Sequence, residues 1–174
     1  MLRFLLVTLA IAVLAPQPAR AASPDCAIDH AVYEPIVGER EDEANYVAET
    51  VPHRAAVGNQ TRFLLVMRNV ATGETKRFAF FSPNGYGRLI ASLERKRKRG
   101  PGAKTDDEQT GPDSTAILFD RELRPLALET LFRPTTRAPA YLILPDLGLS
   151  FWYSTLGRSF VPPQGMWRLA RCAR

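Results

Sequence analysis

The chain contains two cysteines, Cys26 and Cys172, which lie near its opposite ends. An oxidising compartment favours their pairing, and the bond would hold the two ends of the folded domain together. Closing a loop of about 145 residues would remove denatured-state entropy worth up to about 5 kcal/mol in the chain-entropy model. A redox or reactive thiol would need a C-x-x-C motif or a neighbouring base. The sequence shows neither, so we predict a structural disulfide that makes the first and last strands neighbours.

The first 21 residues have the parts of a secretory signal peptide in the expected order. Arg3 supplies the basic start, residues 4–14 form an almost wholly apolar run, and Ala19-Arg20-Ala21 places small residues where signal peptidase must accommodate them. The apolar run has 11 residues, whereas a helix that crosses a bilayer needs about 20. We therefore expect cleavage between Ala21 and Ala22 and a periplasmic or secreted mature chain.

Residues 22–174 have the size of one domain with a substantial core. Loss of the signal peptide removes two arginines and no acids, so the formal net charge falls from +5 to +3. We find no internal repeat, no heptad pattern and no second apolar stretch long enough to span a membrane. The sequence therefore predicts a single, mildly basic domain.

Short apolar segments separated by turn residues predict that this domain is mainly β. Residues 62–70 and 75–81 flank a turn that contains Gly73, and we expect them to form a β-hairpin. Phe78 and Phe80 fall on one face of the second strand and Arg77, Ala79 and Phe81 on the other, so at least one face meets a core. Further strands are predicted at 27–33, 46–51, 114–119, 140–144, 149–153 and 165–172, and residues 126–132 fit either a strand or a helical turn. We predict an antiparallel sandwich or a partly open barrel of about seven to nine short strands.

One helix is predicted near residues 86–97. Its apolar residues follow the spacing i, i+3, i+4, i+7, which is one stripe of a helix, and they are Tyr86, Leu89, Ile90 and Leu93. Basic residues and then Gly100-Pro101-Gly102 follow, as at a helix carboxyl end. Residues from about 98 to 113 are polar and rich in glycine and proline, and we expect them to form a mobile loop.

The sequence offers few candidates for catalysis or metal binding. His30 and His53 are its two histidines, and no third nitrogen or thiol is free to complete a zinc site. The acidic clusters at 41–43 and 106–108 lie in loop-like stretches and are interpreted as solvated. A phosphate-binding loop, a dinucleotide fingerprint and a G-x-S-x-G motif are absent. We predict no catalytic residue, metal or cofactor, and the alternative of a hydrolase requires a histidine beside both an acid and a hydroxyl.

Five consecutive cations are the most unusual feature of the sequence, and they are Arg95, Lys96, Arg97, Lys98 and Arg99. They fit a solvated helix end, and they also fit contact with a polyanion such as an anionic membrane surface. No aromatic residues lie among them to stack on bases, so nucleic acid is not expected as a partner. The membrane hypothesis predicts vesicle binding that weakens as salt rises.

The largest aromatic residues gather near the carboxyl end of the chain, at Phe151, Trp152, Tyr153, Phe160 and Trp167. Such residues fill a core or anchor a partner, and their place in predicted strands favours the core. The sequence as a whole is interpreted as an exported, non-enzymatic binding or inhibitor-type domain that recognises a protein or an envelope polymer through its loops. A secreted hydrolase and a peripheral binder of anionic membranes are the alternatives.

Overall fold

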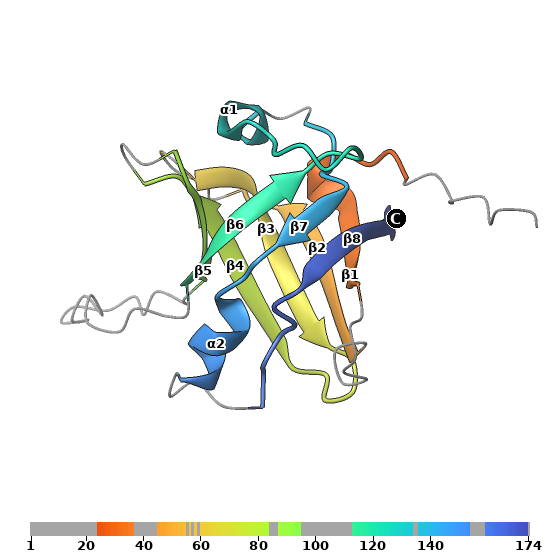
Figure 1. Ribbon diagram of the computed structural model, residues 1–174, viewed down its shortest axis with the longest axis vertical. Helices are drawn as coiled ribbons and strands as arrows, with labels where there is room; N and C mark the ends of the chain where they lie inside the picture. The colour runs from red at the N-terminus through yellow and green to blue at the C-terminus, as the bar shows by residue number, and fades with distance from the viewer. Residues whose placement is uncertain are drawn as a thin grey trace, which may run out of the picture.

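The computed structural model describes residues 24–36, 45–54, 56, 58, 60–83, 87–94, 113–133, 136–153 and 159–173. Eight strands form a closed antiparallel barrel in which each strand pairs with its neighbours in sequence and the last pairs with the first (Figure 1). The strands are β1 (Ala31–Pro35), β2 (Tyr46–Pro52), β3 (Gln60–Asn69), β4 (Thr75–Phe81), β5 (Leu89–Leu93), β6 (Asp113–Phe119), β7 (Tyr141–Ile143) and β8 (Met166–Cys172). The predicted mainly β, antiparallel class is confirmed, and closure between β1 and β8 makes it a barrel instead of a sandwich.

The hairpin of β3 and β4 follows directly from the sequence pattern. Phe78 and Phe80 are fully buried inside the barrel, while Arg77, Ala79 and Phe81 lie on its outer side. The turn between the strands contains Gly73 at φ +74°, a conformation that glycine adopts without steric cost. The Asn69 side chain accepts hydrogen bonds from the backbone N–H groups of Ala71 and Thr72 in the same turn.

Short helices and apolar side chains close the two ends of the barrel. The 3-10 helix η1 (Ile28–His30) places Ile28 in the core at one end, near α1 (Leu128–Leu131). At the other end, α2 (Leu147–Trp152) contributes Phe151, which packs against Phe160 with ring centroids 5.2 Å apart. Figure 1 shows α1 and α2 at opposite ends of the barrel. The interior is therefore a packed core and not an open channel.

The predicted disulfide between Cys26 and Cys172 is confirmed. The Cα atoms are 5.5 Å apart, which is ordinary for a disulfide. Ala31 pairs with Cys172 where β1 meets β8, so the bond fastens the segment before η1 to the end of the last strand. The first and last strands are neighbours, as predicted, and the disulfide fits an oxidising compartment.

The helix predicted near residues 86–97 is wrong, because residues 89–93 form β5. Phe80 pairs with Ala91 on one side of this strand, and Leu89 pairs with Ala116 on the other. Leu89 and Ala91 are buried at a spacing of two residues, which fits a strand, and β5 is needed to join β4 to β6. The predicted mobile loop lies outside the described residues except for Asp113, which begins β6.

The strand predicted at residues 149–153 is also wrong, because residues 147–152 form α2. The three residues of β7 are paired with β6 on one side and with β8 on the other, so neither edge is free to pair with a strand at 149–153. Of the two readings offered for residues 126–132, the helical turn is correct and is α1. The segment predicted as a strand at 27–33 divides between η1 and β1.

Candidate functional site

The two histidines do not form a catalytic arrangement among the residues that the structure describes. The side chain of His30 is 54% exposed, and its Nε2 lies 3.9 Å from the carboxylate of its sequence neighbour Asp29. His53 is buried, and its Nδ1 has no hydrogen-bond partner among the described residues. Neither contact places a histidine beside both an acid and a hydroxyl, and no group of three metal-binding side chains occurs within the described ranges. The hydrolase alternative gains no support from this part of the chain.

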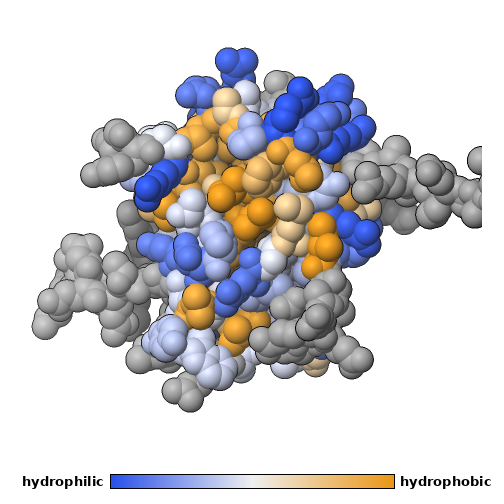
Figure 2. Space-filling view, in the orientation of Figure 1, coloured by the Kyte–Doolittle hydropathy of each residue, from blue (hydrophilic) through white to orange (hydrophobic). Residues whose placement is uncertain are grey.

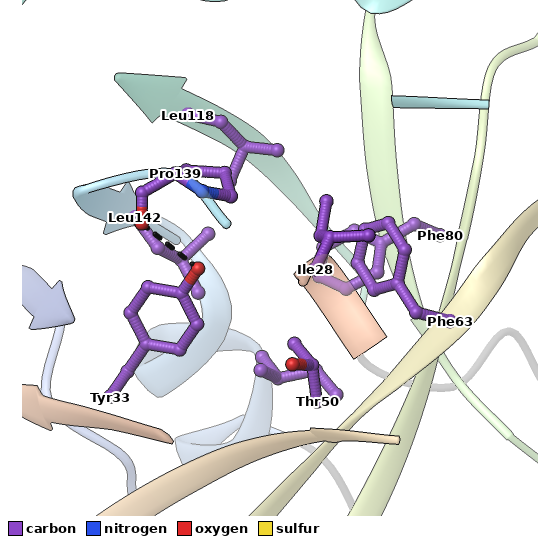
Figure 3. A pocket seen from close by; sticks show the side chains of 9 residues that line it. Ile28, Tyr33, Thr50, Phe63, Phe80, Leu118, Pro139 and Leu142 are labelled. Atoms are coloured by element: carbon purple, nitrogen blue, oxygen red, sulfur yellow. Dashed lines mark hydrogen bonds between the residues drawn. The ribbon is translucent and has the colours of Figure 1, made fainter. Parts of the chain in front are cut away.

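The barrel interior near η1 leaves little room for a ligand. The void there measures about 10 Å³, enough for no more than about one water molecule. Tyr33 points into it, and its hydroxyl donates a hydrogen bond of 3.0 Å to the carbonyl of Pro139 (Figure 3). Complete burial raises the pKa of Tyr33 far above its usual value. Recognition of a ligand at this end of the barrel would therefore occur on its outside.

Helix α2 has two apolar faces, of which one is buried and the other exposed. Leu147 and Phe151 are fully buried and close the barrel end. Leu149 and Trp152 are each 48% exposed and Tyr153 is 81% exposed. These three residues follow the spacing i, i+3, i+4 and so share one side of the helix. We call Leu149, Trp152 and Tyr153 the α2 stripe.

Close contacts hold α2 against the barrel. The Ser150 hydroxyl donates to the carbonyl of Asp113, and the Asp146 N–H donates to the Ser114 hydroxyl. A Cβ atom on Gly148 would lie 2.6 Å from the carbonyl oxygen of Pro162, so only glycine allows the helix to approach this closely. The α2 stripe is therefore presented on a fixed support.

The segment that packs under α2 is held in place from the β3–β4 hairpin. Phe160 is fully buried, and the ammonium of Lys76 lies 5.8 Å from the centre of its ring. Glu74 accepts a hydrogen bond from the hydroxyl of Ser159 and forms an ion pair of 2.9 Å with Lys76. The hydrogen bond from Lys76 is the main cause that lowers the pKa of Glu74. The β3–β4 hairpin thus holds in place the segment that packs against α2.

A second feature is an apolar crevice beside α1 that is also lined by residues of β5 and β6, with a volume of about 230 Å³. It is lined by Gly87, Arg88, Leu89, Thr115, Ala116, Ile117, Leu118, Pro125, Leu126, Leu128 and Leu131. We call it the α1 crevice. Among the described residues that line it, Arg88 is the only charged one.

The outer face of the barrel next to the crevice is also apolar. Ile117 on β6 lies beside Ile143 on β7, which lies beside Met166 on β8. Figure 2 shows hydrophobic residues concentrated over this part of the face, with hydrophilic residues around it. The crevice therefore opens beside a larger apolar surface.

The structure separates the aromatic residues that the sequence grouped together. Phe151, Phe160 and Trp167 are buried, as predicted, but Trp152 and Tyr153 are not. Their exposure was missed because residues 149–153 were assigned to a strand, although the spacing of the α2 stripe is also a helical signal. The α1 crevice has no sequence signal, because it is built from three separate segments.

The remaining predicted site residues lie outside the described part of the chain. These are the cleavage position at Ala21 and Ala22 and the basic run from 95 to 99. Membrane contact through that run stays a prediction. No helix within the described ranges is both long enough and apolar enough to cross a bilayer. Comparison with protein-family models, with curated proteins and with solved structures finds no match to this chain.

Proposed function

We propose that this protein is an exported, non-enzymatic binding domain that recognises a partner protein through the α2 stripe. An inhibitor would be one form of such a domain. The observation that carries the proposal is the exposure of Leu149, Trp152 and Tyr153 on a helix whose opposite face is fixed in the barrel end.

Export is supported by two features that do not depend on one another. The first 21 residues have the order of a signal peptide. Cys26 and Cys172 form a disulfide, a bond typical of exported proteins. We therefore place the binding activity in the periplasm or outside the cell.

The α2 stripe has the composition of a binding hot spot. Tryptophan and tyrosine are enriched among the residues that contribute most to protein interfaces. The stripe is also held in place before binding, because α2 packs on Phe160 and hydrogen-bonds to β6. Little conformational freedom would be lost on association, which favours affinity.

The chemistry of the stripe favours a protein over an envelope polymer. A polysaccharide presents many hydroxyl groups, and each of them needs a polar partner when it is buried. The α2 stripe consists of the aliphatic Leu149 and two aromatic rings, one of which carries a hydroxyl. An apolar pocket on a partner protein is the better match.

The test compares the purified, disulfide-bonded protein with the double variant Trp152→Ala/Tyr153→Ala as bait against the envelope fraction. A protein captured by the first bait is then purified and its Kd is measured with both. Because truncating a hot-spot residue costs about 2 kcal/mol or more, we expect the double variant to bind at least about 30-fold more weakly. Val70→Ala is the matched control, because Val70 is 52% exposed and lies in the β3–β4 turn, outside the stripe.

Three results would contradict the proposal. One is equal affinity of the wild-type protein and the double variant for the captured partner. Another is retention of an envelope polymer in place of a protein. The third is turnover of a substrate by the purified protein without any partner.

A further inference from the structure

The α1 crevice exists because β5 and β6 separate toward one end of the barrel. Their pairing ends at Leu89 and Ala116. Beyond that point the carbonyl of Leu118 accepts a hydrogen bond of 2.8 Å from the N–H of Leu126, and Phe119 forms an isolated bridge with Pro125. Residues 125–126 thus take the place of β5 beside β6, and the crevice is left between them and the start of β5.

The wall of the crevice formed by residues 125–131 is held in place without a ligand. In the turn before it, the Asp120 carboxylate accepts hydrogen bonds from the backbone N–H groups of Glu122 and Arg124 and from the Arg124 side chain. The bond from the Arg124 backbone is the largest cause that lowers the pKa of Asp120. Leu131, at the other end of the wall, is only 1% exposed and belongs to the core. The crevice is therefore preformed.

The lining of the crevice combines apolar side chains with one cation. Arg88 has no hydrogen bond or ion pair with any residue in the part of the chain that the structure describes. Leucine, isoleucine and proline residues make up most of the remaining lining, which also includes Thr115. A ligand that matches this surface carries one negative charge and an alkyl chain.

The volume limits the length of that chain. About 230 Å³ is below the range of about 300–1,000 Å³ that drug-sized ligands occupy. Leu118 lines both the crevice and the small void inside the barrel. A single short chain fits, and the two long chains of a membrane lipid do not.

We infer that the α1 crevice binds a free medium-chain organic carboxylate, with its alkyl chain between the start of β5 and α1 and its carboxylate on Arg88. This site is separate from the α2 stripe. Whether or not the crevice binds a carboxylate therefore has no bearing on the proposed binding of a partner protein at the stripe.

Titration of the purified, disulfide-bonded protein with sodium octanoate, followed by ¹H–¹⁵N NMR, tests the inference. We expect a Kd between about 10 μM and 1 mM for a ligand of this size. The shifted amides should include those of Arg88, Ile117 and Leu128. Each methylene removed should weaken binding about fourfold, because a buried methylene contributes a fixed transfer free energy. Hexanoate should therefore bind about 15-fold more weakly.

Variants separate the contribution of the charge from that of the chain. Arg88→Gln should weaken octanoate binding about 1.5-fold to fivefold, the range of an exposed ion pair, and should leave octanol binding unchanged. Arg62→Gln is the matched control, because Arg62 is an exposed arginine on β3 that does not line the crevice. This control variant should change the affinity for neither octanoate nor octanol.

The inference is overturned by the absence of shifts at the crevice with 10 mM octanoate, a concentration about tenfold above the weakest Kd expected. It is also overturned if Arg88→Gln and wild type bind octanoate equally. Binding of the protein to vesicles of anionic phospholipid without binding to free octanoate would contradict the inference as well. It would indicate that the α1 crevice contacts a membrane.

Discussion

Thr50 shows how one buried hydroxyl joins two strands of the barrel. Its Oγ1 accepts a hydrogen bond of 2.9 Å from the N–H of Ala31 and donates one of 3.2 Å to the carbonyl of the same residue. The register between β1 and β2 includes Val32 with Glu49 and Tyr33 with Ala48. The threonine side chain therefore satisfies the backbone of Ala31, the first residue of β1.

Replacement of Thr50 by valine should lower the free energy of unfolding by about 1–3 kcal/mol, because it leaves a buried N–H and a buried carbonyl without this partner. Denaturant unfolding followed by tryptophan fluorescence measures the change. Thr115→Val is the matched control on the outer side of β6, where the change should stay within about 0.5 kcal/mol. Equal effects of the two substitutions would show that the Thr50 hydrogen bonds add nothing.

At the scale of the element, the two faces of α2 have different roles. Its buried face closes the barrel, and its other face presents the α2 stripe to solvent. The approach of the helix to residue 162 depends on Gly148, because a Cβ there would lie 2.6 Å from a backbone oxygen. The position of the stripe therefore depends on a residue that is not part of it.

Gly148→Ala should destabilise the protein by about 1–3 kcal/mol, because the added methyl group forces α2 and the backbone near Pro162 apart. The same variant should also weaken binding of a partner at the stripe. Gly165→Ala is the matched control, since a Cβ at Gly165 would meet nothing closer than 4.0 Å. Thermal unfolding of both variants measures the difference, and a wild-type Tm for Gly148→Ala would contradict the prediction.

At the scale of the whole molecule, the barrel is closed both by hydrogen bonds and by a covalent bond. β1 and β8 pair along five residues of β1, and the disulfide joins positions 146 residues apart beside that pairing. A bond that closes so long a loop restricts the unfolded chain strongly. We therefore expect the disulfide to provide a large share of the stability.

The double variant Cys26→Ala/Cys172→Ala should lose up to about 5 kcal/mol of unfolding free energy in the chain-entropy model. Denaturant unfolding of wild type and variant, each with and without reductant, measures the loss. Reductant should destabilise the wild type and leave the double variant unchanged. A loss below about 1 kcal/mol would show that the strand pairing alone closes the barrel.

The sequence by itself determined the features that depend on a local residue pattern or on there being a single pair of cysteines. The apolar runs of β3 and β4, with Gly73 between them, predict their hairpin because apolar runs and turn chemistry are local properties. The disulfide was predictable because Cys26 has one possible partner. These two features together already imply an antiparallel β domain with adjacent ends.

Tertiary structure alone decided β5, α2 and the two candidate binding surfaces. Leu89 and Leu93 suit either a helix or a strand in isolation, and the pairing of residues 89–93 with β4 and β6 selects the strand. Trp152 is exposed because Phe151 occupies the barrel end, and the α1 crevice arises where residues 125–126 replace β5 beside β6. Such outcomes depend on contacts between segments far apart in the chain, and a local pattern contains no information about those contacts.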